Sequence, residues 1–210
     1  MPVDYKKTEK ALYLPKTTPS IINVPTMTFI MVDGVGNPNT SEAYKTAVEI
    51  LYGLSYSIKM SKKGGFAPDG YFDYVVPPLE GLWWLTDCQA PDFSDKDKYC
   101  WTSMIRQPDF VTPDVFTEAK AALSKKKPKL DISIARLERF NEGLCAHVLY
   151  IGSYDDEPKT IKGLECFITE SGYLSDISET RRHHEIYLND PRKVASEKIK
   201  TIIRHPIKKS

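Results

Sequence analysis

The hydrophobic pattern near the start of the chain predicts a strand followed by a helix. Residues 26–36 (TMTFIMVDGVG) predict a first strand that ends in glycines. Asn39 then predicts a helix N-cap, with Glu42 three residues later as in a capping box. The apolar residues that follow at helical spacing are Ala43, Ala47, Val48, Leu51, Leu54 and Ile58. The KKGG run after them predicts the end of this helix.

Further strands follow in the first half. Residues 72–85 predict one or two strands interrupted by Pro77 and Pro78. After the acidic loop of residues 90–98, residues 99–108 predict another strand.

A second helix is predicted to start at Thr112 and Pro113, which suit the N-cap and first helical position, and to run through Leu123. The KKKPK run at residues 125–129 predicts a solvated linker, with a basic binding site as the less favoured alternative. Residues 130–140 predict a strand or connector rather than part of a functional site.

The second half of the chain repeats this plan. Residues 144–154 predict a strand, and the acidic DDEP run after it suits the N-terminus of a helix. The apolar face of that helix comprises Ile161, Leu164, Phe167 and Ile168. HHEIYL and KIKTIIRHP predict the last two strands.

The two halves also resemble each other locally. SMIRQP and TIIRHP give Arg106 and Arg204 equivalent places, and Gly34 and Gly152 each close a strand before a helix. We therefore expect an α+β fold of two βαββ units related by a pseudo-twofold axis. Each helix would cover the outer face of an antiparallel sheet, and the other sheet faces would line a central cleft.

The HHEIYLNDP segment holds the most informative alternation. Strand geometry puts successive side chains on opposite faces. One face has His184, Ile186 and Leu188, and the other has His183, Glu185 and Tyr187. We expect the first set to pack under the helix and the second to point into the cleft. The alternative is a solvated strand surface, with Glu185 paired to Arg106 or a lysine.

Composition narrows the class of protein. Lys plus Arg is 29 and Asp plus Glu is 28, a formal net charge of +1, which gives no electrostatic drive toward nucleic acid or a membrane surface. The chain has no apolar run long enough for a transmembrane helix and no secretory h-region at its start, so we expect a cytoplasmic protein. The cysteines show no metal-ligand spacing and are expected to be reduced thiols: Cys88, Cys100, Cys145 and Cys166. Twelve Tyr, eight Phe and three Trp suit either a core or an aromatic-walled pocket.

Three motifs together resemble the GyrI-like small-molecule-binding family: PPLEGLWWLTD, EGLCAHVLYIGSYDDEP and HHEIYLNDPRKVASEKIKTIIRHP. The resemblance implies a duplicated βαββ fold of the SHS2 type with a central ligand cleft, in which Glu185 faces the ligand. It implies an N-terminal arm (residues 1–26) and a single domain (residues 27–210) of two repeats, about 27–124 and 130–210.

Some free-standing members of the family hydrolyse cyclopropane-bearing, DNA-alkylating natural products of the duocarmycin type, and the LEGLWW and HHEIYL motifs look most like those members. The arm is too short for a helix-turn-helix domain, which argues against a transcription factor. One departure is that Tyr150 and Ser153 stand where the family more often has His and Pro.

The resemblance implies a reaction that needs no metal or cofactor. Glu185 would be the base that activates water, and a tyrosine hydroxyl would orient the water or hold the ligand carbonyl. The candidate tyrosines are Tyr150, Tyr154 and Tyr187, with His183 beside them. The flat ligand would stack on tryptophan, for which the candidates are Trp83, Trp84 and Trp101. Trp83 and Trp84 are adjacent on a strand, so only one can face the cleft.

Two other functions stay open. A non-catalytic binder could sequester flat hydrophobic or cationic compounds, since a carboxylate with aromatic walls suits cations. An interaction protein that binds a cellular enzyme is the third possibility, although the sequence shows no exposed apolar helix or charge patch for it.

His183 and His184 point apart on the strand, and a His183–Glu185 metal site would lack a third ligand. We expect a small aromatic ligand as the partner and a monomer or weak dimer.

Overall fold

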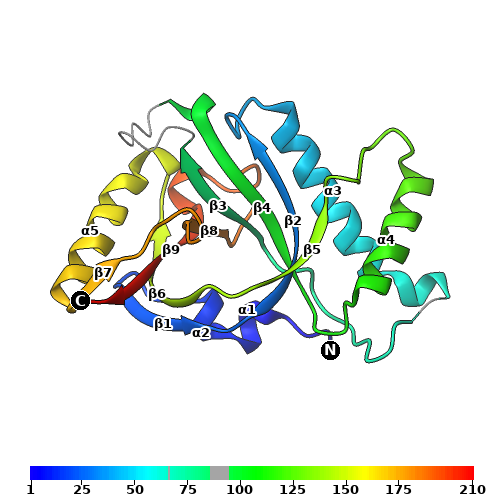
Figure 1. The fold of residues 1–210 in the computed structure, drawn as a ribbon, viewed down its shortest axis with the longest axis horizontal. Helices are drawn as coiled ribbons and strands as arrows, with labels where there is room; N and C mark the ends of the chain where they lie inside the picture. Colours follow the sequence, from blue (N-terminus) through cyan, green and yellow to red (C-terminus); the bar gives the residue numbers. More distant parts are fainter. Residues whose placement is uncertain (66, 86–94) are drawn as a thin grey trace. The chain divides into compact units, whose positions relative to one another are not determined.

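The computed structural model describes residues 1–65, 67–85 and 95–210, and it combines helices with antiparallel strands as predicted (Figure 1). Cys88 and residues 90–94 of the predicted acidic loop lie outside the described residues. The chain divides into two compact units. The first unit comprises Met1–Asp4, Met27–Pro77 and Trp83–Phe140. The second unit comprises Tyr5–Thr26, Pro78–Leu82 and Asn141–Ser210.

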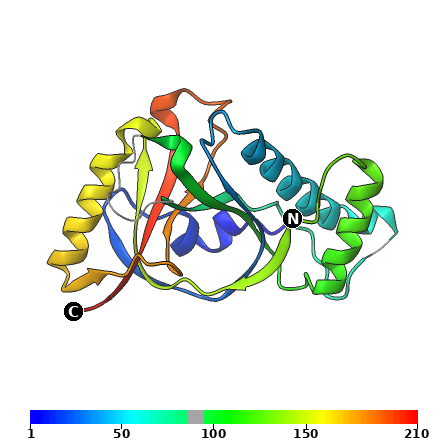
Figure 2. The same ribbon diagram turned by 45° about the horizontal axis from the view of Figure 1, so that its top comes forward.

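The first unit is a small antiparallel sheet with two helices. Its elements are β2 (Met27–Val35), α3 (Glu42–Lys59), the end of β3 (Leu79–Leu85), β4 (Tyr99–Gln107), α4 (Pro113–Lys126) and β5 (Arg136–Phe140). β2 pairs with β4 on one side and with β5 on the other. α3 packs on β2 and β4, and α4 packs on α3, as Figure 2 shows in cyan and green.

The starts of the two helices test the predicted caps. The prediction of Asn39 as N-cap is wrong, because α3 is capped by Ser41, whose Oγ accepts the Tyr44 N–H at 3.3 Å. Asn39 instead donates its N–H to Asn37 Oδ1 at 3.0 Å within the preceding turn. The Thr112 cap of α4 is confirmed, since its Oγ1 accepts the backbone N–H of the third helical residue.

The second unit joins the N-terminal segment to the second half of the chain. Its elements are α1 (Tyr5–Thr8), α2 (Lys10–Tyr13), β1 (Ser20–Val24), the start of β3, β6 (Gly143–Ile151), α5 (Glu157–Glu170), β7 (Tyr173–Ser175), β8 (His183–Tyr187) and β9 (Lys200–Lys209). The strand order is β1-β6-β9-β8, followed by the start of β3, and β7 pairs with the end of β9. The N-terminal segment is therefore part of this sheet, because β1 pairs antiparallel with β6.

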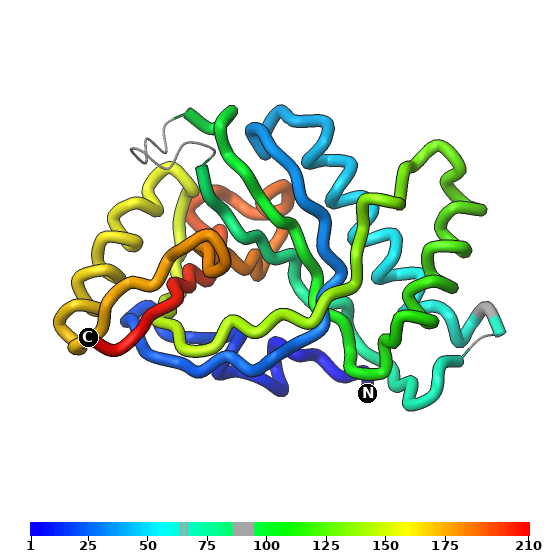
Figure 3. The backbone as a smooth tube through the Cα atoms, in the orientation of Figure 1, coloured from blue at the N-terminus to red at the C-terminus, as the bar shows by residue number. Residues whose placement is uncertain are grey.

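The predicted apolar face of α5 builds the core of the second unit. Leu164 and Ile168 pack on strand residues with almost no exposure: Ala146, Val148, Tyr150, Ile203 and Ile207. Figure 3 traces the chain from β6 through α5 to β9. In the first unit β2, α3, β3 and β4 follow in this order, and β4 lies between β2 and β3. In the second unit β6, α5, β8 and β9 follow in the same order, with the short β7 between α5 and β8, and β9 lies between β6 and β8. This shared order agrees with the predicted βαββ plan.

Candidate functional site

The pairing of β8 with β9 decides which face of the sheet carries Glu185. Residues directly opposite each other in antiparallel strands point to the same face. Glu185 lies opposite Ile203, and Ile203 packs with Leu164 and Ile168 of α5. Glu185 therefore lies on the face of the sheet that α5 covers.

This finding corrects the face assignment made from the sequence. The alternation along β8 is confirmed, but the prediction that His184 and Ile186 pack under the helix is wrong. The set that shares the α5 face is His183, Glu185 and Tyr187. Alternation shows which residues share a face, but both faces of this strand are largely buried, so alternation alone could not show which face meets the helix.

Glu185 is held by side chains on its own strand and the next one. Its Oε1 lies 3.0 Å from His183 Nε2, and its Oε2 accepts the Tyr187 hydroxyl at 2.8 Å. His183 Nδ1 lies 2.7 Å from His205 Nε2. We call these four residues the Glu185 cluster. The Glu185 side chain is 15% exposed. Burial, together with the charge of His183, lowers the pKa of His205 to about 3, which keeps His205 neutral at pH 7.

A second carboxyl group faces this cluster from α5. Glu157 is the first residue of α5 and is 6% exposed. Burial raises the pKa of Glu157 to about 9, and the negative charge of Glu185 adds to the shift. Its Oε1 accepts no hydrogen bond from any described residue. At neutral pH Glu157 therefore carries a proton.

The other two candidate tyrosines lie close by but make different contacts. Tyr150 donates its hydroxyl to the Ser153 carbonyl at 2.5 Å. The ring of Tyr154 meets the ring of Tyr187 edge to face, with 6.2 Å between centroids. Among the predicted tyrosines, Tyr187 bonds to Glu185 through its hydroxyl.

The opposite face of β8 carries a buried ion cluster, which we define as Glu80, Glu142, His184 and Arg204. His184 Nδ1 lies 2.9 Å from Glu142 Oε1, and Arg204 Nη1 donates to Glu142 Oε2 at 2.8 Å. His184 Nε2 is also 3.0 Å from Glu80 Oε2, although this contact lacks the alignment of a hydrogen bond. Each of the four residues is at most 6% exposed.

Opposite charges fix the protonation states in the buried ion cluster. Burial alone would raise the pKa of Glu142, but the charges of His184 and Arg204 hold it down to about 2. Burial alone would lower the pKa of His184, but Glu142 raises it to about 9. The cluster also fastens the N-terminal segment, since Arg204 Nη2 donates to the Leu12 carbonyl at 3.0 Å and the Tyr13 hydroxyl donates to Glu80 at 3.2 Å.

The predicted tryptophans belong to the first unit. Trp101 is 1% exposed, and its ring lies against Gly34, where a Cβ atom would come within 2.2 Å of it. Tyr44 of α3 packs against both Trp101 and Trp83. Trp84 is half-buried. Contact of these rings with a ligand stays a prediction.

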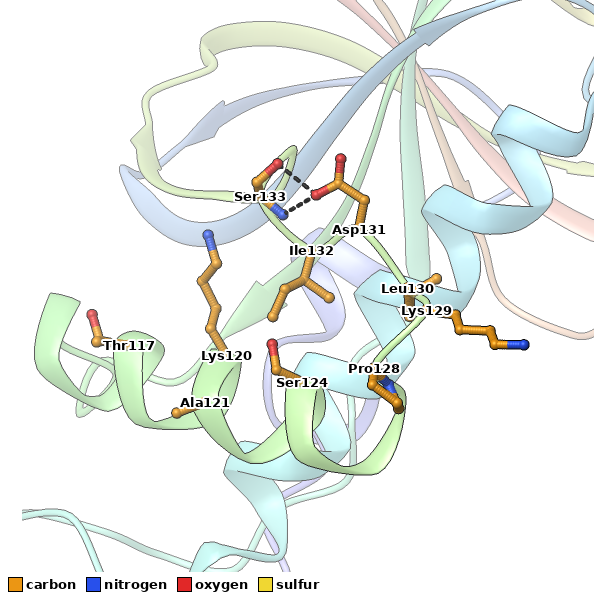
Figure 4. A pocket seen from close by; sticks show the side chains of 10 residues that line it. All are labelled: Thr117, Lys120, Ala121, Ser124, Pro128, Lys129, Leu130, Asp131, Ile132 and Ser133. Atoms are coloured by element: carbon orange, nitrogen blue, oxygen red, sulfur yellow. Dashed lines mark hydrogen bonds between the residues drawn. The ribbon is translucent and has the colours of Figure 1, made fainter.

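A pocket of about 740 Å³ lies in the first unit, between α4 and the connector that precedes β5 (Figure 4). Asp131 accepts hydrogen bonds from the backbone N–H and hydroxyl of Ser133 at its rim. Its lining residues are Thr117, Lys120, Ala121, Ser124, Pro128, Lys129, Leu130, Asp131, Ile132 and Ser133. The site residues predicted from the sequence lie elsewhere.

Comparison with known proteins identifies the family. A model described as the GyrI-like small molecule binding domain matches residues 17–208. The chain belongs to the GyrI-like family. Among solved structures, an uncharacterized conserved protein from Listeria innocua is 48% identical, with 98% of this chain and 100% of that chain covered and a TM-score of 0.93.

Two further GyrI-like neighbours are hydrolases from Listeria innocua. One is 47% identical, with 98% of this chain and 100% of that chain covered and a TM-score of 0.90. The other is 46% identical, with 99% and 100% covered and a TM-score of 0.92. A search of curated proteins found no match. The family predicted from the three motifs is thus confirmed, and with it a small-molecule-binding domain.

Sequence reasoning missed three carboxyl groups of this GyrI-like chain. Glu157 was predicted only as part of an acidic helix start, and Glu80 and Glu142 stand in the family motifs without a predicted role. Each lies far along the chain from the strand residue that it faces. Within the described residues, no three His, Cys, Asp or Glu side chains are grouped to hold a metal ion. The helices described are too short or too polar to cross a membrane.

Proposed function

We propose that this GyrI-like protein is a hydrolase that adds water to a strained electrophilic ring on a flat aromatic compound. The substrate class is the duocarmycin type, in which a cyclopropane is conjugated to a dienone, and the role would be detoxification of such DNA-alkylating compounds. The observation that carries the proposal is the Glu185 carboxylate, partly exposed and fixed by His183 and Tyr187. The hydrolases among its solved neighbours support the same reaction class.

The chemistry follows from that arrangement. Glu185 takes a proton from water, and the water oxygen attacks the cyclopropane carbon. One ring C–C bond breaks, and its electron pair passes through the dienone to the carbonyl oxygen, which becomes a phenolate and takes up a proton to give the phenol. The hydrogen bonds from His183 and Tyr187 hold the carboxylate in one orientation, which reduces the entropy lost on reaching the transition state. General base catalysis of this kind contributes a factor of about 10²–10⁴ in rate.

A cytoplasmic monomer or weak dimer would suffice for this task. The test is incubation of the pure protein with a duocarmycin-type cyclopropanoid, with the ring-opened water adduct followed by mass spectrometry. We expect many adducts per protein molecule, and a loss of about 10²-fold or more in kcat for Glu185→Gln. Glu165→Gln, on the exposed side of α5, is the matched control and should retain the wild-type rate. Full turnover by Glu185→Gln would show that Glu185 is not the base.

A non-catalytic binder remains the second candidate, because the Glu185 carboxylate lies beside the Tyr187 ring, which packs on Tyr154. A carboxylate next to aromatic rings suits a flat cation. A tight complex with intact compound and no adduct in the same experiment would establish this function instead.

A further inference from the structure

Glu157 has no part in the reaction described above, yet it lies next to the proposed base. It begins α5, is more than nine-tenths buried, and has an Oε1 atom without a hydrogen-bond partner in the described part of the chain. An unpartnered buried polar atom costs about 1–3 kcal/mol. A carboxyl group in such a place does not help the fold, which directs attention to chemistry.

Contacts just before α5 place Glu157 beside the Glu185 cluster. Tyr154, three residues before Glu157, packs edge to face on Tyr187, and the Tyr187 hydroxyl bonds to Glu185 at 2.8 Å. The negative charge of Glu185 adds to the raised pKa of Glu157, as expected for neighbouring carboxyl groups. Glu157 is thus the group through which α5 meets the proposed base.

We propose that Glu157 is the acid of the same reaction and donates its proton to the dienone oxygen while Glu185 removes a proton from water. This inference rests on the proposed function. A C–O bond forms between the water oxygen and the cyclopropane carbon while one cyclopropane C–C bond breaks. The electron pair of the broken bond ends on the dienone oxygen, which receives the proton of Glu157. Glu185 then holds the proton from water, and its transfer to Glu157 restores both groups for the next turnover.

The surrounding groups are compatible with one proton shared by two carboxyl groups. On β8, His183 and Tyr187 bond to the two oxygens of the Glu185 carboxyl group. On β9, His205 stays neutral and adds no charge. Just before α5 lie two further acids, Asp155 and Asp156. Two like charges at close range do not both persist, so the pair separates into one acid and one base.

The experiment compares kcat and KM of wild type, Glu157→Gln, Glu157→Asp and Glu165→Gln across the pH range with the cyclopropanoid substrate. Gln has the shape of a protonated Glu but cannot release a proton. We expect Glu157→Gln to lower kcat by about 10²-fold with little change in KM. The wild-type rate should fall at alkaline pH as Glu157 loses its proton, and this alkaline limb should be absent in Glu157→Gln. Glu157→Asp should recover part of the rate, because it keeps an acid at this position.

The outcomes separate the two proposals. If wild type and Glu157→Gln turn over equally well, with the same pH profile, while Glu185→Gln is inactive, Glu157 is not the acid and the proposed function stands. If wild-type protein forms no adduct, the proposed function fails, and the role of Glu157 fails with it.

Discussion

One strand, β8, carries two histidine–carboxylate clusters on its two faces, and they differ in how well their charges are balanced. On one face, Glu142 lies between His184 and Arg204, within 2.9 Å of each, and the whole group is buried. On the other face, Glu185 is partly exposed, and it meets a second acid, Glu157, whose pKa it helps to raise, rather than an opposite charge.

The difference shows how to separate structural from chemical polar clusters. A buried ion cluster is tolerated when each charge has an opposite partner and its hydrogen bonds are made. The buried ion cluster satisfies this condition and fastens the N-terminal segment through Arg204 and Tyr13. Beside the Glu185 cluster, by contrast, Glu157 has an Oε1 atom without a hydrogen-bond partner in the described part of the chain, and its raised pKa keeps it protonated at pH 7. Poorly balanced carboxyl groups with solvent access are typical of catalytic sites.

The largest expected effect is on stability, at Glu142. Glu142→Gln removes the negative charge and leaves His184 and Arg204 buried side by side, so we expect a loss of about 3–5 kcal/mol in the free energy of unfolding. Glu185→Gln should change it by only about 1 kcal/mol, because its position is partly hydrated. Urea unfolding of the two variants at pH 7 measures both values, and equal losses would remove the distinction between the clusters.

The second prediction is that a substitution at Glu157 stabilises the protein, whereas most substitutions destabilise it. Its pKa is raised from the ordinary 4.5 to about 9, so the stability linked to its proton is fully present below pH 4.5 and is lost as the pH rises toward 9. Glu157→Gln has no proton to lose. We expect its free energy of unfolding to exceed that of wild type by about 4 kcal/mol at pH 8, with little difference at pH 4.5. A variant less stable than wild type at pH 8 would mean that the carboxyl group supports the fold.

A third prediction uses the pH response of the buried ion cluster. The pKa of His184 is raised from 6.5 to about 9, so its contribution is complete below pH 6.5 and is lost as the pH rises through 9. The pKa of Glu142 is lowered from 4.5 to about 2, so its contribution is present above pH 4.5 and is lost as the pH falls toward 2. The cluster is therefore most stabilising between pH 4.5 and 6.5.

The measurement is urea unfolding in steps of pH. Wild type should lose about 1 kcal/mol between pH 7 and 8 through His184 alone. His184→Gln should show a shallower decline over the same step, and the part that remains reports Glu157. Identical slopes for the two proteins would show that His184 is not charged at pH 7.

Local sequence signals predicted most elements but not the long-range contacts. The strand that became β2, the Thr112 cap and the apolar face of α5 depend on neighbouring residues, and the structure confirms them. Asn39 was misplaced because several turn-forming residues precede α3 and any of them could cap it. The orientation of β8 depends on the register with β9, and Glu157 reaches Glu185 only through the packing of α5, so neither was readable from spacing along the chain.

The smallest expected effects come from a matched pair of tyrosines, one on each cluster. Tyr187→Phe removes the hydrogen bond to Glu185 and should lower kcat about 3–10-fold, the equivalent of roughly 0.5–1.5 kcal/mol. Tyr13→Phe removes the bond to Glu80 and should instead lower the free energy of unfolding by about 1 kcal/mol while kcat stays at the wild-type value. Each variant is thus the control for the other, with turnover and urea unfolding measured on both. A fall in kcat in Tyr13→Phe equal to that in Tyr187→Phe would show that the two faces of β8 act together rather than separately.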